Sequence, residues 1–403
     1  MSRKPRLLVF NQYYWPGVEA TATLLSELCR YLAEDFDVKV ITGTLRGTDA
    51  RHGTVERDGV KIVRVRSSAF DRRRLSLRAL NYVTYLAQSL RCGLLQRRPD
   101  VVLCMTDPPV IGDIALIVAR RFRAPLVVVS QDIFPEVAVE LKRLENPALV
   151  NLLRVLVGFY LKRADRVVAI GETMSSRLVE KGVPPERIRI IPNWVDTTAI
   201  HPSDRDNDWT RLNGLTDRFV VMHSGNVGHA QDLDSLIRAA TFLRDLERLS
   251  VVVIGTGARH AELVSLAARL EVDSVVFLPY QPRSSLSLSL SSADLHVVGL
   301  AQGLSGFVVP SRLYGILAVG KPVIAAAEAD SETAQLVTTV GCGVVVPPGR
   351  PELLAAAIRN AYEGRLDLDE MGSRAREFVD REASTAVAVS RYRAVLAELI
   401  PPE

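Results

Sequence analysis

Residues 308–326, VVPSRLYGILAVGKPVIAA, place a serine and an arginine at the start of a helix, directly after a proline. An apolar strand leads into Pro310, Ser311 and Arg312, and a helical stretch follows. Unpaired backbone N–H groups and the helix dipole favour an anion at such a point. The same residues could form a plain helix cap, with Ser311 bonded to the first turn and Arg312 in solvent. Taken alone, the stretch allows both an anion site and a helix cap.

The loop SQDIFPE, residues 130–136, follows a buried strand and carries the polar side chains of Gln131, Asp132 and Glu136. Doubly wound folds bind their ligands at the carboxyl ends of their strands, so this loop is a candidate part of a site. A turn in which Asp132 caps the next segment is the alternative.

Two loops with glycines also follow strands. NQYYWPGVEATA (11–22) brings Gly17 to the start of a helix, where it could contact a phosphate or a sugar. HSGNVGHAQDLDSL (223–236) has glycines that let the backbone approach a ligand closely. In the same loop, Asn226 and Gln231 can donate hydrogen bonds.

The segment VVVIGTGARH (251–260) resembles the start of a dinucleotide fingerprint, because a GxG follows a strand. The third glycine is missing, however, and no acidic residue ends a strand about 20 positions later. The segment therefore predicts a tight strand-to-helix turn beside a nucleotide, with Gly257 close to the ligand, and disfavours an NAD-dependent enzyme.

Strands must position these loops, and the chain offers a regular series of them. Short apolar runs alternate with amphipathic helices such as 20–33 and 232–244. Continuous apolar strands separated by helices indicate a parallel sheet that is covered on both faces. The predicted strands are 6–11, 38–42, 60–65, 101–104, 126–130, 166–169, 188–191, 219–224, 250–254, 275–278, 295–298, 322–326 and 343–346.

The polar, strand-free stretch 201–218 reads as a linker and divides the chain into two halves of similar size. We predict an N-terminal domain over 1–198, a C-terminal domain over 199–383, and a last helix within 384–403 that packs back on the N-terminal domain. Two doubly wound domains would place a ligand in the cleft between them.

The composition is that of a globular chain of 403 residues, with a net charge of +4 that suits an acidic substrate but does not argue for nucleic acid. The four cysteines have no CxxC spacing and so predict neither a zinc site nor a disulfide framework. MSRKPRLLVF runs straight into a strand, and no apolar run approaches the ~18 residues that span a bilayer. We therefore expect a cytoplasmic protein.

In this order, the loops resemble those of the retaining glycosyltransferases of family 4, in the subgroup that builds bacterial surface polysaccharides. That resemblance implies the GT-B fold: α/β, with two Rossmann-like doubly wound domains facing across a cleft. It runs along almost the whole chain, through a Pro-Gly loop at 16–17, PDVVLCMTDPP, QDIFPE, ADRVVAIGETM, IPNWVD, SGNVGHAQDLDSLI, VIGTGA and PSRLYGILAVGKPV.

The resemblance implies transfer of a hexosyl or N-acetylhexosaminyl group from a nucleotide diphosphate sugar, expected to be a UDP-sugar, to an acceptor hydroxyl. Configuration would be retained, and no metal or other cofactor would be required. In this family the C-terminal domain holds the nucleotide and the N-terminal domain holds the acceptor. The base would lie near Leu278 and Tyr280, and Gly306 and Phe307 would line the donor site.

The chain departs from the family in two places. The usual Glu-x7-Glu motif would align on Phe307 and Gly315, so both carboxylates are absent. The usual Arg and Lys that meet the diphosphate would align on Asn226 and Gln231. Arg312 is the best remaining cation, and we predict that it clamps the diphosphate together with the N–H groups after Pro310. Ribose recognition stays unassigned.

On the acceptor side, the family often has a histidine where this chain has Gln131. The resemblance implies a transfer without an enzymic nucleophile, in which Asp132 could orient or help to deprotonate the acceptor hydroxyl. Gln131 and Asp132 are therefore the predicted catalytic residues.

Residues 70–100 place arginines, Arg72–Arg74 among them, around a largely apolar run with helical spacing. This pattern fits either a core helix with basic ends or an interfacial helix on anionic lipid at the inner face of the cell membrane. The acceptor could accordingly be a lipid-linked saccharide or a soluble one.

Two other functions remain open at this point. A nucleotide-sugar 2-epimerase shares the fold but should carry acid/base carboxylates and histidines, of which this chain shows few. A non-catalytic nucleotide-sugar-binding protein is conceivable because the Glu-x7-Glu motif is lost.

Overall fold

The computed structural model describes residues 3–17, 19–44, 52–68, 70 and 75–400, and for residues 75–79 it describes the backbone alone. The chain forms two compact units. The first comprises Met1–Pro192 and Ala388–Glu403, and the second comprises Asn193–Val387.

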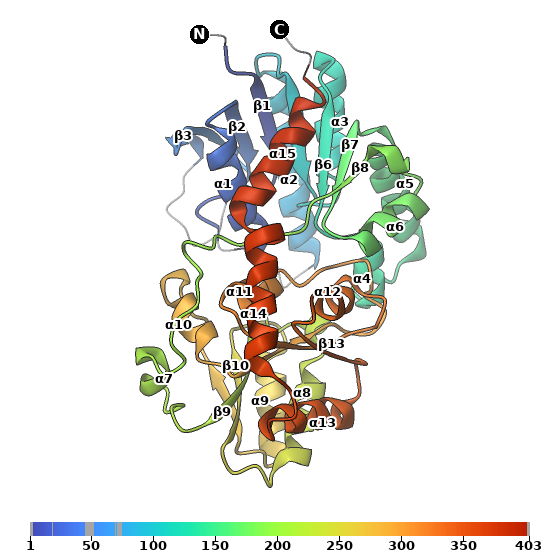
Figure 1. The fold of residues 1–403 in the computed structure, drawn as a ribbon. Helices are drawn as coiled ribbons and strands as arrows, with labels where there is room; N and C mark the ends of the chain where they lie inside the picture. Colours follow the sequence, from blue (N-terminus) through green and yellow to red (C-terminus); the bar gives the residue numbers. More distant parts are fainter. Residues whose placement is uncertain (1–2, 18, 45–51, 69, 71–74, 401–403) are drawn as a thin grey trace. The chain divides into compact units, whose positions relative to one another are not determined.

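The first unit is built on an eight-stranded sheet in the order β3-β4-β2-β1-β5-β6-β7-β8 (Figure 1). All neighbouring strands are parallel except β3 and β4. The strands are β1 Arg6–Phe10, β2 Asp37–Thr42, β3 Gly53–Arg57, β4 Val60–Arg64, β5 Val101–Met105, β6 Leu126–Ser130, β7 Arg166–Ala169 and β8 Ile188–Ile190. The α-helices are α1 Ala20–Leu32, α2 Leu75–Leu94, α3 Ile111–Phe122, α4 Glu136–Glu140, α5 Pro147–Arg163 and α6 Glu172–Glu180, and a 3-10 turn, η1, spans Pro185–Arg187.

The second unit has a six-stranded, all-parallel sheet in the order β11-β10-β9-β12-β13-β14. Its strands are β9 Phe219–Ser224, β10 Leu249–Ile254, β11 Val275–Leu278, β12 Leu295–Gly299, β13 Val323–Ala326 and β14 Gly343–Val346. Its α-helices are α7 Asp208–Leu212, α8 Leu233–Ala239, α9 His260–Arg269, α10 Leu286–Ser291, α11 Arg312–Ala318, α12 Glu332–Val340, α13 Pro351–Tyr362 and α14 Leu368–Phe378. The 3-10 turns η2 His229–Gln231, η3 Ala240–Leu243 and η4 Arg283–Ser285 and the π-helix η5 Val379–Ala383 lie between them. The last helix is α15 Thr385–Ala397, which belongs to the first unit from Ala388 onward.

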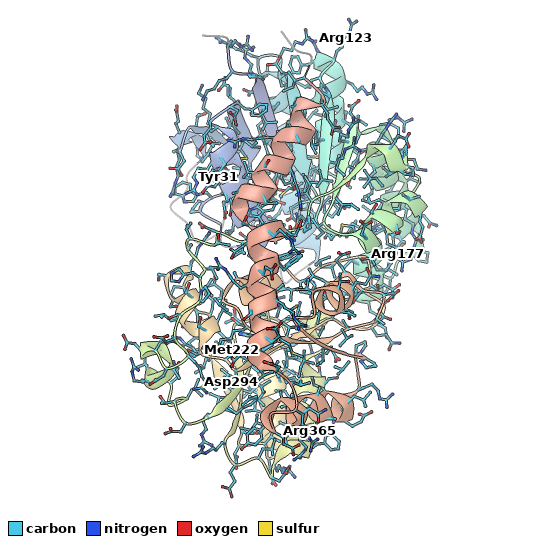
Figure 2. All side chains as sticks on the ribbon, in the orientation of Figure 1. Tyr31, Arg123, Arg177, Met222, Asp294 and Arg365 are labelled. Atoms are coloured by element: carbon cyan, nitrogen blue, oxygen red, sulfur yellow. The ribbon has the colours of Figure 1, made fainter. Side chains whose placement is uncertain are left out.

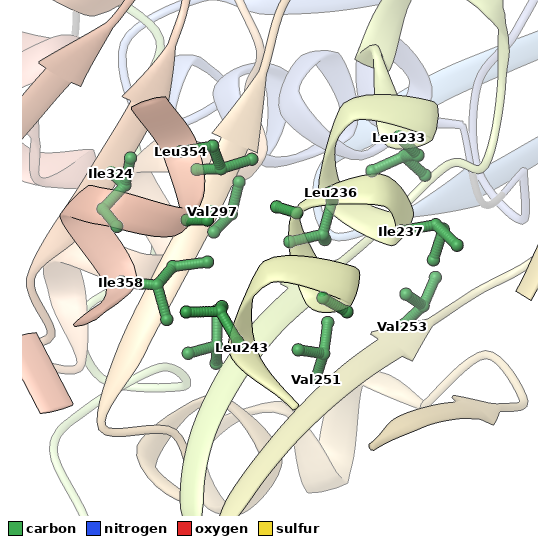
Figure 3. Close-up of a cluster of buried hydrophobic side chains, with 14 of the residues drawn as sticks. Leu233, Leu236, Ile237, Leu243, Val251, Val253, Val297, Ile324, Leu354 and Ile358 are labelled. Carbon is green, nitrogen blue, oxygen red and sulfur yellow. The ribbon is translucent and has the colours of Figure 1, made fainter. Parts of the chain in front are cut away.

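Apolar strands buried on both faces hold each sheet in place. In the second unit, side chains from α8 and α13 pack over β10, β12 and β13 in one cluster (Figure 3), which includes Leu236, Val251, Val297 and Ile358. Burying one such side chain contributes about 1.5–3 kcal/mol. The sheet is therefore rigid enough to fix the loops that leave its edge.

Each sheet has one point at which the strand order reverses. In the second unit β9 lies between β10 and β12, and in the first unit β1 lies between β2 and β5. The loops on either side of such a point diverge and leave a crevice at the carboxyl ends of the strands. The topology thus singles out the β9/β12 edge and the β1/β5 edge as candidate sites.

The predicted α/β fold of two doubly wound domains is confirmed, and each of the thirteen predicted strands appears within one residue at either end. The strand β3 was missed. Its sequence, GTVER, is exposed at every position, so no apolar pattern marks it.

The prediction that residues 201–218 form a linker between the two domains is wrong. Residues 201–218 pack on the second unit, and the division between the units falls earlier, after Pro192. Arg205 forms an ion pair with Asp294 at 2.7 Å, and Asp294 also accepts from the Val220 N–H at 2.7 Å (Asp294 is labelled in Figure 2). The buried Trp209 donates to Gln281 at 2.9 Å. The sequence pattern predicted a linker because charged residues dominate the stretch and the few residues that anchor it are not recognisable from sequence.

The end of the chain belongs to the first unit from Ala388 onward. Arg393 of α15 bonds Glu34 at 2.7 Å, and Arg166 bonds Glu398 at 2.9 Å. Residues 193–198 lie in the second unit, where the Val195 N–H donates to the carbonyl of Ala383 at 3.0 Å.

We predict that His296 makes the second unit sensitive to acid. Burial lowers its pKa to about 4, and its Nε2 lies 3.0 Å from the carbonyl of Leu290. Below about pH 6.5 the unfolded chain takes up a proton that the folded chain refuses, so stability falls as the pH falls. From pH 7.5 to pH 5 the loss due to this residue should be about 2 kcal/mol. Urea unfolding of the wild type and of His296→Gln at both pH values measures it, and an equal loss in both proteins would contradict it.

Candidate functional site

The predicted donor residues of the second unit leave the same edge of its sheet. They follow β9, β10, β11 and β12, whose carboxyl ends lie side by side because the sheet is wholly parallel. After β9 come Asn226 and Gln231, after β10 Gly257, at and after β11 Leu278 and Tyr280, and after β12 Gly306, Phe307, Pro310, Ser311 and Arg312. The edge includes the β9/β12 reversal point, where a doubly wound sheet binds ligands.

Arg312 spans this reversal point. It is the first residue of α11, and its Nη1 lies 2.6 Å from Nε2 of His223, which belongs to β9. Its guanidinium also covers the backbone of Gly225, since a Cβ on that glycine would lie 3.1 Å from the Arg312 Cζ. Arg312 therefore carries a charge from the β12 side of the crevice to the β9 loop.

The Arg312–His223 contact joins a cation to a neutral ring. Burial, and then the charge of Arg312, hold the pKa of His223 well below its usual range, so the imidazole is uncharged at neutral pH and can accept from the guanidinium. Burial lowers the pKa of Arg312 to about 10, so this side chain remains a cation. Among the residues that the structure describes, no carboxylate lies within ion-pair distance of Arg312. A partly buried charge without a counterion is costly unless an anion joins it.

Glycines bring the β9 and β10 loops into backbone contact. A Cβ on Gly255 would lie 1.9 Å from the Gly225 carbonyl oxygen, and one on Gly257 would lie 2.1 Å from the Val227 carbonyl oxygen. Gly225 itself has a φ of +143°, which side-chain-bearing residues rarely adopt. The backbones of the β9 and β10 loops therefore pack directly against each other, and Arg312 lies against the β9 loop.

Asn226 and Gln231 lie together against Gly228. The Gly228 N–H donates to Oε1 of Gln231 at 3.0 Å, and a Cβ on Gly228 would meet Nδ2 of Asn226 at 2.7 Å. Both amides stand where the family's Arg and Lys would align, so this loop adds hydrogen-bond donors but no charge.

The remaining donor candidates line the neighbouring loops. The Leu278 carbonyl accepts from the Gly255 N–H at 3.1 Å, while the Tyr280 side chain is exposed. Gly306 has a φ of +75°, and the Phe307 N–H donates to the Leu304 carbonyl at 3.1 Å.

Glu328, which follows β13, binds the loop between β12 and α11. Its Oε2 accepts from the Gly303 N–H at 3.0 Å, which steadies the stretch that leads to Arg312.

The helix mouth is less favourable to an anion than predicted. Ser311 is the N-cap of α11, but its side chain makes no capping bond. The Leu313 N–H already donates to the Pro310 carbonyl at 3.1 Å, and the Tyr314 N–H to that of Ser311 at 3.3 Å. The helix has only seven residues, so its dipole is small. The weight of the anion argument therefore moves from the N–H groups to the Arg312 side chain.

In the first unit, the predicted catalytic residues lie after β6, at the carboxyl edge of the sheet. Oδ1 of Asp132 accepts from the Thr106 hydroxyl at 2.9 Å, and the Gln131 N–H reaches the same hydroxyl at 3.3 Å. Gly17 also lies in this unit, in a turn where its N–H donates to the Tyr14 carbonyl at 2.9 Å. The donor candidates thus divide, with Gly17 in the first unit and the others in the second.

His223 and Gly225 were not among the predicted donor-binding residues, although the glycines of the 223–236 loop were expected to let the backbone approach a ligand. The available signal was a histidine closing the otherwise apolar strand FVVMHS at its carboxyl end. Within the described ranges, no group of three or more His, Cys, Asp or Glu side chains could hold a metal ion.

Two family models match the chain in sequence. Residues 19–194 match a "Glycosyl transferase 4-like domain", and residues 205–378 match "Glycosyl transferases group 1". The chain thus carries both domains of a glycosyltransferase.

Curated relatives agree with this assignment, and a solved structure has the same fold. A protein of Escherichia coli K12 that is named as a colanic acid biosynthesis glycosyl transferase, WcaI, is 35% identical over 55% of this chain and 54% of its own length. WbjE of Pseudomonas aeruginosa, named as a glycosyltransferase, is 27% identical over 75% of this chain and 76% of its own. The match to WcaI therefore spans about half of that relative. Anabaena HepE, solved in complex with UDP, shares the fold with a TM-score of 0.76 at 15% identity, covering 98% of this chain and all of that one. The fold is GT-B.

We predict that Gly225→Ala destabilises the protein more than Gly53→Ala does. Both glycines have a φ near +140°, at +143° and +133°, so both alanines suffer the same kind of backbone strain, about 1–3 kcal/mol. Only at Gly225 does the new methyl also press on Arg312, whereas the space around Gly53 is open. Chemical denaturation of the two variants measures the difference. Equal losses would show that Arg312 does not rest on Gly225.

Proposed function

We propose that the protein is a retaining, metal-independent glycosyltransferase of family 4 that moves a sugar from a UDP-sugar to a hydroxyl of a growing polysaccharide or glycoconjugate in the cytoplasm. The observation that carries the proposal is Arg312, a cation at the β9/β12 reversal point with no carboxylate partner in the described part of the chain. Loops of both neighbouring strands approach it, as the close contact of Arg312 with Gly225 shows.

The chemistry requires charge compensation on the leaving nucleoside diphosphate. A fixed guanidinium in a site with little water stabilises the charge that develops on the β-phosphate as the glycosidic bond breaks. In this proposal Arg312 takes over from the family's Arg/Lys pair, and His223 positions it. The Asn226 and Gln231 amides would donate to the diphosphate or to the sugar.

The acceptor side of the proposal rests on Asp132. Its carboxylate lies at a strand end in the first unit and is oriented by the Thr106 hydroxyl. It would orient the acceptor hydroxyl and take up its proton late in the transfer, while Gln131 bonds the sugar. A hexosyl or N-acetylhexosaminyl donor and a soluble or lipid-linked acceptor both fit this scheme. No observation favours the 2-epimerase, and turnover separates a transferase from a non-catalytic binder.

We predict that UDP stabilises the wild type and that Arg312→Ala abolishes the effect. At about 100 times its dissociation constant a ligand adds about 2.7 kcal/mol. The thermal shift is measured with UDP, GDP, ADP, dTDP and NAD⁺, with uridine to isolate the part due to the diphosphate. Arg365→Ala, at an exposed arginine of the same unit (labelled in Figure 2), is the matched control and should keep the full shift.

Each other outcome of this screen has a definite meaning. A UDP shift that persists in Arg312→Ala would show that Arg312 does not bind the diphosphate and that Pro310-Ser311-Arg312 only begins a helix. A shift with NAD⁺ alone would overturn the transferase.

We predict that Asp132→Asn lowers turnover by about a hundredfold or more and leaves the UDP shift unchanged. An asparagine keeps an oxygen for the Thr106 hydroxyl, so the fold should survive. Asp165→Asn is the control, because Asp165 accepts from the Leu126 N–H at 2.9 Å before β7, at the opposite edge of the sheet. Unimpaired transfer by Asp132→Asn would remove the carboxylate from the mechanism.

A further inference from the structure

Helix α5 of the first unit is apolar on its outward side as well as on its inward side. Val157 and Tyr160 are buried, and the Tyr160 ring closes over Gly112 of α3. The outward side exposes Leu149 by 42%, Leu152 by 55%, Val155 by 67% and Phe159 by 46%. These four recur every three or four residues and so form one stripe. A helix that is apolar nearly all round is usually covered on both sides.

The charges that α5 itself carries are all positive. Helix α5 contains no Asp or Glu, and it ends in Lys162 and Arg163. The Arg163 guanidinium lies 3.8 Å from the centre of the Phe159 ring, which keeps a cation beside the apolar stripe. Arg154, by contrast, is neutralised by Glu136 at 3.2 Å.

The neighbouring helices extend the same character. Helix α3 packs against both α5 and α2, and it exposes Ile117. Helix α2 carries no acidic residue and exposes Leu80 and Val83, whereas its Tyr85 is buried and donates to the Ile41 carbonyl at 3.1 Å. The arginines Arg72–Arg74 of the predicted membrane segment lie outside the described residues.

We propose that the outward stripe of α5 lies on an anionic lipid surface, with the helix parallel to the membrane plane. No helix of the described part of the chain is long and apolar enough to cross a bilayer. An apolar stripe about 15 Å long, with Lys162 and Arg163 at one end and no acidic residue on its helix, fits shallow insertion among acyl chains beside negative headgroups. A protein partner would have to bring its own acids to match the same cations. This inference is independent of the donor site.

Vesicle co-sedimentation tests the proposal on the full chain. We expect binding to vesicles of phosphatidylcholine with phosphatidylglycerol, and much weaker binding to phosphatidylcholine alone. The double variant Leu152→Gln/Val155→Gln should lower the partition to anionic vesicles about tenfold or more, because it removes two inserted side chains. Lys162→Gln/Arg163→Gln should lower it and reduce its dependence on salt.

The matched control is Leu212→Gln/Phe242→Gln, which replaces side chains of the second unit that are 85% and 54% exposed. It should bind like the wild type. Absence of binding by the wild type, equal binding by the α5 variant, or equal loss in the control would overturn the proposal. So would sedimentation velocity showing a wild-type dimer that the α5 variant dissociates, because the stripe would then join two copies. The UDP shift, recorded for every variant, separates failure here from failure of the donor site.

Discussion

Among the residues that the structure describes, Arg312 meets no carboxylate, and a neutral histidine accepts from it instead. The position of this cation depends on most of the second unit. His223 must stay uncharged, which its burial at the end of β9 ensures. Gly225 must lack a side chain so that the guanidinium can rest on its backbone. The arrangement places a cation without a described counterion at the reversal point of the sheet, and a diphosphate would supply that counterion.

The parallel sheets explain why residues far apart in sequence meet. Two strands, β10 and β11, separate β9 from β12 in the chain, yet β9 with His223 and β12, which leads to Arg312, are neighbours in the sheet. The first unit repeats the arrangement at β1 and β5, where the Gln12 N–H donates to the Asp107 carbonyl at 2.8 Å. In both units the rigid part is apolar and buried, and the chemistry is confined to loops at one edge. This division lets loop composition change while the fold is kept.

The sequence predicted the sheets well because their strands are continuous apolar runs, as in β5 and β6, where every residue is buried. It missed β3, whose residues are all exposed, and it took the stretch around Trp209 for a linker because a few buried anchors do not outweigh many charges. At the site, the sequence pointed to Arg312 but not to its partner. The contact with His223 depends on strand order, and spacing along the chain does not reveal strand order.

The central claim, that Arg312 binds the diphosphate of the donor, is tested most directly by a crystal structure of the protein with UDP. The account predicts phosphate oxygens within hydrogen-bond distance of the Arg312 guanidinium, with His223 still in contact on its other side. A diphosphate bound elsewhere, with Arg312 still directed only at His223, would contradict it.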